Sequence, residues 1–148
     1  MRKEEFLEKI KDTYKITKAN QKNPTEPHNI CMYLASDWYT LCVKEGEIPS
    51  TDVVASLDVH ILQDTVLSTI LGIEDPRTNN RINFIGGIRG VQELEKLVDS
   101  DEYKVAFSMF PTQVSDIIQV ANAKKVMPPK STWFEPKLRS GLIVHLLD

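Results

Sequence analysis

Hydrophobic residues at the start of the chain follow first a helical and then a strand period. Residues 4–13 place Phe6, Leu7 and Ile10 among charged side chains, and this spacing predicts a short amphipathic helix. Residues 14–19 are a possible strand. The first strand is therefore expected to follow the first helix directly.

A hairpin is the next feature that the pattern predicts. Residues 20–27 hold two prolines and several polar side chains, which is typical of a loop. Residues 28–35 and 38–44 have the composition of strands, and Ser36 and Asp37 between them are suited to a short turn. Two strands with a two-residue connection indicate a β-hairpin.

A longer helical stripe occupies the middle of the chain and ends near Leu71. Either Thr51 or Ser56 could cap its N-terminus, and Gly72 stands where a C-terminal cap is expected. Gln63 falls near the apolar stripe, and because a buried amide needs partners, we expect it to bond a neighbouring loop. The stripe consists of Val59, Leu62, Val66 and Ile70, with Leu67 beside it.

The second half of the chain is predicted to alternate strands and helices. Residues 81–85 are a short strand, which leads through a glycine-rich turn into a helix with the apolar stripe Val91, Leu94, Leu97 and Val98. Residues 103–109 alternate between large apolar and small or polar side chains, as a strand does. Another helix opens at Pro111 and Thr112, and its stripe is Val114, Ile117, Ile118 and Ala121.

The C-terminal part combines an irregular stretch with an apolar run. Residues 127–139 contain three prolines, and residues 141–147 are nearly all apolar, which predicts a central strand covered on both faces. Leu142, Val144 and Leu146 are expected in the core. The order of elements predicts one α+β domain over residues 1–148, with a mixed β-sheet and helices packed on it in two layers.

The charge balance excludes several classes of protein. Eighteen basic and 21 acidic residues give a net charge of −3, mixed along the chain, so nucleic acid is not an expected partner. The charged N-terminal stretch lacks the apolar region of a signal peptide. No apolar run approaches the roughly 18 residues that span a bilayer, so a soluble cytoplasmic protein without a membrane partner is expected.

Cysteine and histidine positions show no pattern typical of a metal site. Cys31 and Cys42 stand in apolar runs, where buried free thiols are favoured over a disulfide. Asp58 and His60 do not share one helix face, and His145 is interpreted as a core residue, so no metal ligand is assigned. The sequence contains no nucleophile motif, so no catalytic residue is assigned, and the identity of any cofactor stays open.

The most unusual stretch is residues 127–138, which is polar, aromatic and rich in proline. Prolines pre-order a loop and lower the entropy lost when it binds a ligand. Four side chains there could present donors to an anionic group: Lys130, Ser131, Thr132 and Lys137. The alternative is a rigid connector, in which Trp133 and Phe134 fill the core and the lysines are solvated.

Two other places are candidates for binding an anion. Gly86 and Gly87 stand at a strand-to-helix junction beside Arg89, where backbone amides can point at an anion. A tight glycine turn is the alternative there. The preceding polar loop carries two arginines and a carboxylate, which form either an anion clamp or a surface salt bridge. These residues are Asp75, Arg77 and Arg81.

Several segments together carry a resemblance to a known family. The most specific is Met-Pro-Pro-Lys-Ser-Thr-Trp-Phe-Glu-Pro-Lys-Leu at 127–138, followed by Ser-Gly-Leu at 140–142. Residues 57–63, 71–73 and 81–87 add to it. The chain resembles the C-terminal part of the prokaryotic family called domain of unknown function 1015, and the resemblance covers most of its length.

The resemblance implies that this chain is the C-terminal domain or a fragment of a larger protein. Members of the family carry an upstream Asp-Gly-His-His-Arg element, which relates them distantly to the ParB-like and sulfiredoxin-like superfamily with its nucleotide-using kinases. This sequence has no adjacent pair of histidines. The family has no assigned function, but Lys130, Ser131, Thr132 and Lys137 lie in its most distinctive motif.

Two functional hypotheses follow from the sequence. The first is a non-catalytic C-terminal module that completes an upstream ParB-like domain of the same protein or forms a homo-oligomer. An exposed apolar patch is its expected signature. The second is the phosphate-binding part of a nucleotide-dependent small-molecule kinase or hydrolase, whose acid and base residues lie upstream. Convergence of Lys130 and its neighbours with Arg81 or Arg89 is the signature expected of that site.

Overall fold

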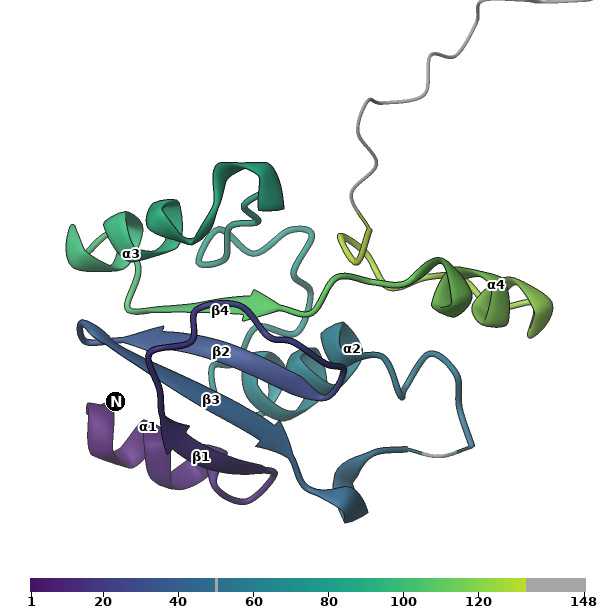
Figure 1. Cartoon of the computed structure of the whole chain (residues 1–148), viewed down its shortest axis with the longest axis horizontal. Coiled ribbons are helices and arrows are strands. Elements are labelled where there is room, and N and C mark those ends of the chain that lie inside the picture. The colour runs from purple at the N-terminus through teal and green to yellow at the C-terminus, as the bar shows by residue number, and fades with distance from the viewer. Residues whose placement is uncertain (50, 133–148) are drawn as a thin grey trace, which may run out of the picture.

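The computed structural model describes residues 1–49 and 51–132 of the chain. Its sheet has four strands in the order β1-β3-β2-β4, and each pairing between them is antiparallel. β2 and β3 form the predicted hairpin, and β4 joins β2 from much later in the chain (Figure 1). The strands are β1 (Tyr14–Lys18), β2 (Asn29–Leu34), β3 (Asp37–Val43) and β4 (Val105–Met109).

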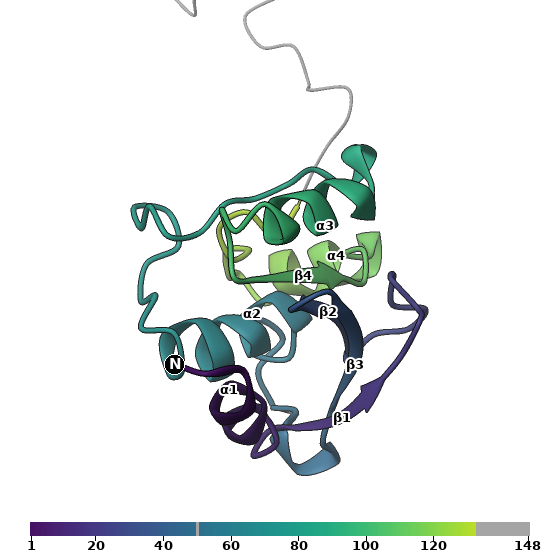
Figure 2. The same ribbon diagram turned by 90° about the vertical axis from the view of Figure 1, so that its left-hand side faces the viewer.

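Helices pack on both faces of this sheet. In Figure 2, α1 and α2 lie on the same side of β2 and β3, and α3 packs against the other face. The expected α+β class is confirmed, although the described strands are all antiparallel where a mixed sheet was expected, and helices on both faces replace the expected two layers. The helices are α1 (Lys3–Ile10), α2 (Asp58–Leu62), α3 (Val91–Asp99) and α4 (Val114–Asn122). Gln63–Ser68 continues α2 as a π-helical segment, and Glu45–Glu47 and Gly87–Arg89 are short 3₁₀ turns.

The core has one part on each face of the sheet because side chains alternate along every strand. The larger part contains Phe6, Ile10, Tyr14, Ile30, Met32, Leu34, Tyr39, Leu41, Val43, Ile61, Leu62 and Val66. The smaller part contains Cys31, Tyr33, Trp38 and Val98. The alternation predicted for residues 103–109 is confirmed within β4, since Val105, Phe107 and Met109 face the larger part and Ala106 faces the smaller. It is wrong for Tyr103, which precedes the strand and packs against the smaller part.

Two polar contacts attach α3 to the sheet. The Trp38 indole Nε1 donates a hydrogen bond to Glu95 Oε1 at 2.8 Å, and the Tyr33 hydroxyl donates to Asp99 Oδ1 at 3.0 Å. Lys22, whose Nζ lies 2.8 Å from Glu95 Oε1, and the Trp38 indole hold the pKa of the Glu95 carboxyl below its usual range. These contacts fix the orientation of α3 over β2 and β3.

The hairpin turn lies one residue earlier than predicted. Leu34 pairs with Asp37, so the connection is Ala35 and Ser36, with φ of 50° and 62°. Positive φ at both central residues is the type I′ geometry, whose twist matches that of the flanking strands. Asp37 belongs to β3 instead of the turn because its backbone pairs with Leu34, and its carboxylate binds Lys3 and Lys18.

The predicted strand at residues 81–85 is wrong. The Arg81 backbone N–H donates to Asn79 Oδ1 at 2.9 Å, and its guanidinium donates to the carbonyl oxygen of Gly72 at 2.8 Å. These bonds hold the segment against the end of the π-helical turns and away from the sheet. A short run of strand-like composition does not form a strand unless a partner strand is within reach.

The predicted cap of the middle helix is also wrong, although its end is confirmed. Neither Thr51 nor Ser56 caps it, since Leu57 is the N-cap residue of α2 and makes no side-chain cap. Asp52 Oδ1 instead accepts the backbone N–H of Val54 at 2.8 Å and forms an earlier turn. Gly72 has φ +66°, the left-handed conformation expected of a C-terminal cap.

The apolar stripe predicted for α4 does not face the core. Val120 is 1% exposed, whereas Val114 and Ile118 are 72% and 54% exposed. The helix begins with a capping box between Gln113 and Asp116, which the sequence analysis did not identify. Apolar spacing identified the helix correctly, but the packing places a different side against the rest of the chain.

Several sequence predictions lie outside the described residues. They are the strand at 141–147 with its core residues Leu142, Val144 and Leu146, the aromatic pair Trp133 and Phe134, and His145. Of the two cysteines, Cys31 is buried and free as predicted, whereas Cys42 is free but exposed. Among the described residues, no helix is long and apolar enough to cross a membrane.

Candidate functional site

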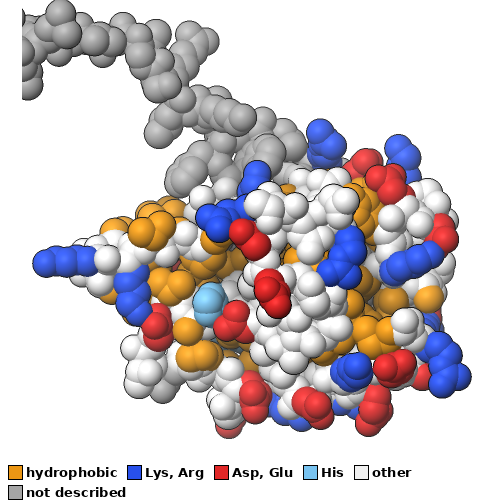
Figure 3. Space-filling model, turned by 180° about the vertical axis from the view of Figure 1, so that it is seen from behind, with side chains coloured by type: hydrophobic (Ala, Val, Ile, Leu, Met, Phe, Trp, Pro, Cys, Tyr) orange, Lys and Arg blue, Asp and Glu red, His pale blue; other side chains and the backbone are white. Residues whose placement is uncertain are grey.

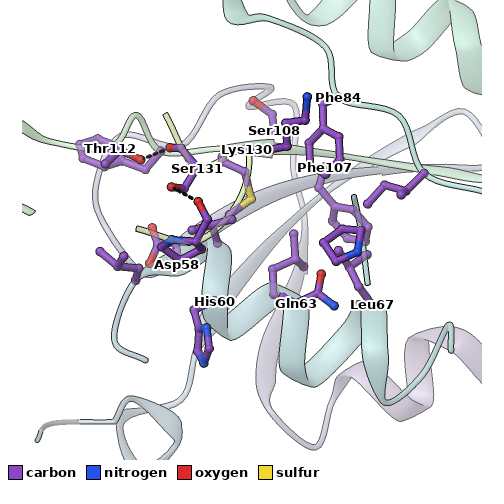
Figure 4. A pocket seen from close by; sticks show the side chains of 18 of the residues that line it. Asp58, His60, Gln63, Leu67, Phe84, Phe107, Ser108, Thr112, Lys130 and Ser131 are labelled. Atoms are coloured by element: carbon purple, nitrogen blue, oxygen red, sulfur yellow. Dashed lines mark hydrogen bonds between the residues drawn. The ribbon is translucent and has the colours of Figure 1, made fainter. Parts of the chain in front are cut away.

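A large open cleft of about 1600 Å³ lies between the α2 region, the segment before α3, β4 and the segment after α4. Side chains from all four regions point toward this hollow in Figure 4. Its apolar walls include Leu67, Phe84, Leu94 and Phe107. Ligand sites in proteins are typically apolar clefts with a few polar groups at fixed places.

Six of the eight residues predicted from the sequence to bind an anion line this one cleft. They are Arg81, Gly86, Gly87, Lys130, Ser131 and Thr132. Arg89 lies in the adjacent 3₁₀ turn but does not line the cleft, and Lys137 lies outside the described residues. The structure thus brings together residues that stand far apart in the sequence.

Most acidic side chains of the cleft already have partners. Asp75 binds Arg77 through two hydrogen bonds of 2.9 Å, and this contact lowers the pKa of the Asp75 carboxyl to about 2. The surface salt bridge expected there is therefore present, and Arg81 is not part of it. The Asp116 carboxylate accepts the Gln113 backbone N–H at 2.9 Å. Glu74 forms no ion pair with a described residue.

The basic side chains Arg81 and Lys130, by contrast, contact no carboxylate of a described residue. Arg81 uses one nitrogen to bond the Gly72 carbonyl and keeps its remaining donors. Lys130 stands in a turn with φ +61°, and its side chain is exposed. These two cations therefore have no acidic partner among the described residues, while the carboxylates of Asp58, Glu74, Asp75 and Asp116 also line the cleft.

The N-terminus of α3 also opens into the cleft. Gly90 and Val91 both line it, and no side chain caps the helix there. Gly90 has φ +70°, which is strained for any residue with a Cβ and so requires glycine. The free amides of the first helical turn carry a partial positive charge that adds to that of Arg81 and Lys130.

Ser131 holds the last described segment in place. Its hydroxyl donates to the Pro128 carbonyl oxygen at 2.6 Å, and its own carbonyl oxygen accepts from Thr112 Oγ1 at 2.7 Å (Figure 4). The hydroxyl proton is therefore already used within the turn. Ser131 positions Lys130 and is not a free donor to a ligand.

One polar pair of the cleft was missed by the sequence analysis. The His28 backbone N–H donates to Asp58 Oδ1 at 2.9 Å, and His28 Nδ1 lies 2.9 Å from the same oxygen without an aligned hydrogen bond. Burial raises the pKa of the Asp58 carboxyl, while the contacts with His28 oppose that rise. No sequence spacing could reveal a contact between residues 30 apart in different elements.

Gln63 behaves as predicted from its place beside the apolar stripe. Its Nε2 donates to the Ile73 carbonyl oxygen at 2.8 Å and lies 3.3 Å from that of Glu74. The bond holds the loop after the π-helical turns against the floor of the cleft. His60 contacts Asp64 at 3.2 Å, one helical turn away.

Comparisons with models of protein families, with curated proteins and with solved structures give no match. The family resemblance therefore stays an expectation from the sequence. Within residues 1–49 and 51–132, no group of three or more His, Cys, Asp or Glu side chains could hold a metal ion.

Proposed function

We propose that this chain is a non-catalytic binding module whose cleft holds a phosphate-bearing small molecule. Any reaction of that molecule would use acid and base residues of an upstream domain, as the family resemblance implies. The observation that carries the proposal is that Arg81, Lys130 and the α3 N-terminus all line one cleft.

The charges and walls of the cleft support a ligand of this kind. Phosphate oxygens accept hydrogen bonds from guanidinium, ammonium and helix N-terminal amides alike. Of the four carboxylates that line the cleft, Asp58, Asp75 and Asp116 accept hydrogen bonds from neighbouring groups, which reduces their repulsion of an anion, and Glu74 is the fourth. Apolar walls at Leu67 and Leu94, away from the β4 edge, leave room for an uncharged body attached to the phosphate.

Titration with inorganic phosphate and pyrophosphate, followed by NMR, tests this proposal. Saturable shifts are expected at Arg81, Gly90 and Lys130. Charged hydrogen bonds contribute about 1.5–3 kcal/mol each, so Arg81→Gln or Lys130→Gln should weaken binding by about tenfold to a hundredfold. Lys124→Gln, which removes an equal charge outside the cleft, is the control. Equal affinity in all three variants, or no saturable shift, contradicts the proposal.

A second candidate function rests on α4, whose exposed apolar side is one that a partner domain could cover. Val114 and Ile118 are mostly exposed, and Val126 after the helix is 86% exposed. Hydrophobic side chains are visible on the α4 end of the molecule in Figure 3. We propose that an upstream domain of the same protein packs here, as the resemblance implies for a C-terminal module.

Co-expression with the polypeptide encoded directly upstream of Met1 tests this docking. Wild-type chain should co-purify with it, and Ile118→Asp should abolish the association because it places a charge on the apolar side of α4. Gln119→Asp adds the same charge one residue further on and should leave the association intact. A stop codon directly before Met1, or equal binding by both variants, contradicts this candidate.

A further inference from the structure

β4 is an edge strand whose free side lies along the cleft. In the order β1-β3-β2-β4 it pairs with β2, and no other described strand lies beside it. Six consecutive residues, 105–110, line the cleft. Since successive side chains point to opposite faces, a cavity that contacts all six must run along the open edge of the strand.

An open edge of this kind needs a partner. Its unpaired N–H and C=O groups are a template for another strand, and apolar side chains beside them add to the attraction. Phe84, which lines the same cleft, is 37% exposed, and Val105, Phe107 and Met109 are partly buried. A strand added here would form hydrogen bonds with the free backbone groups of β4 and would also cover this apolar surface.

The last described residues of the chain lie near this edge of β4. The Thr112–Ser131 hydrogen bond places the last described residues beside the C-terminal end of β4, and Thr132 lines the cleft. Residues 133–140 are eight residues, which can span at most roughly 26–29 Å, whereas a five-residue strand is roughly 17 Å long. The apolar run at 141–147 is therefore within reach of the whole edge.

We propose that the open edge of β4 is the docking site of the chain's own residues 141–147, which pair antiparallel with β4 as a fifth strand. Five of the seven residues in this run are leucine, isoleucine or valine, at 142–144 and 146–147, so it supplies apolar side chains to both faces. A tethered segment reaches an effective concentration on the order of millimolar, far above that of a separate chain. The docking is independent of the proposed function, which rests on Arg81, Lys130 and α3.

Amide hydrogen exchange on the full chain tests this docking. The β4 amides that do not bond β2 should be protected in wild type. Val144→Pro should speed their exchange by about tenfold or more, because proline removes a donor from the middle of a strand. Ser140→Pro, which places the same residue outside the run, should change little. Amides of Cys31 and Leu41 in the central strands report whether each variant stays folded.

Three outcomes would overturn the docking. The first is that those β4 amides exchange without protection in the wild-type chain, which can be measured without any variant. The second is protection that Val144→Pro leaves unchanged, which assigns the edge to another segment. The third is protection that falls on dilution, which assigns it to a second copy of the chain. Phosphate titration of the same samples reports on the proposed function separately.

Discussion

Leu41→Ala is expected to lower the free energy of unfolding by about 2–5 kcal/mol, the range for emptying a buried leucine site. Leu41 lies in β3, is 0% exposed, and pairs with Ile16 of β1 on one side and Ile30 of β2 on the other. Neighbouring strands hold the backbone on both sides, so the cavity cannot close by local movement. The loss should fall in the upper half of that range.

Urea denaturation of wild type and variant, followed by circular dichroism, measures this loss. Val114→Ala is the matched control, because it removes apolar atoms from a side chain that is 72% exposed. The control should lie within about 0.5 kcal/mol of wild type. Comparable losses in both variants would show that β3 is not the centre of the core.

Raising the pH from 10 to 12 is expected to destabilise the protein through Tyr14. Burial raises the pKa of the Tyr14 hydroxyl to about 12, and the nearby Asp58 carboxylate acts in the same direction. The hydroxyl lies 2.9 Å from Thr65 Oγ1, whose own proton is donated to the Ile61 carbonyl oxygen, so Thr65 accepts from the neutral tyrosine. A tyrosinate would therefore lose this hydrogen bond as well as its hydration.

The direction of the pH effect follows from proton linkage. The unfolded tyrosine loses its proton near pH 10 and the folded one near pH 12, so the stability is complete below pH 10 and is lost as the pH rises to 12. Two pH units correspond to about 2–3 kcal/mol. Tyr14→Phe should be less stable than wild type at pH 8 by about 1 kcal/mol, from the lost hydrogen bond, and should lack this part of the alkaline decline.

Denaturation curves of both proteins at pH 8, 10, 11 and 12 give the comparison. Other tyrosines and lysines titrate in the same range, but they are common to both chains, so the difference between the two declines isolates Tyr14. Parallel declines would show that the Tyr14 hydroxyl is not shielded from water.

The sequence pattern predicted helices and strands correctly where interactions within a few residues determine them. The helix at residues 4–13, the hairpin, and the alternation within 105–109 all follow from side-chain periods that any short segment displays by itself. Gln63 was also predicted correctly, since its place beside an apolar stripe left its amide in need of a partner. The same reasoning was wrong at residues 81–85, where hydrogen bonds from Arg81 hold the segment away from the sheet.

The candidate site was predicted in its residue types but not in its arrangement. Six anion-binding candidates line one cleft, whereas Ser131 uses its hydroxyl within its own turn and Arg89 lies apart. The pair of His28 and Asp58 was missed entirely. Each of these differences depends on which hydrogen bonds a side chain finds after folding, and the residue type alone does not specify them.

The sequence by itself determined the α+β class, the positions of most helices and strands, and Gly72 as a helix end. These follow from periodicity and backbone preferences that act within a few residues. Only the tertiary structure decided that β4 pairs with β2 and leaves an open edge, that α4 turns Val120 inward, and that Arg81 and Lys130 line the same cleft. Such arrangements depend on contacts between residues distant in the chain, and many packings share the same local pattern, so the free energy of the whole core selects among them.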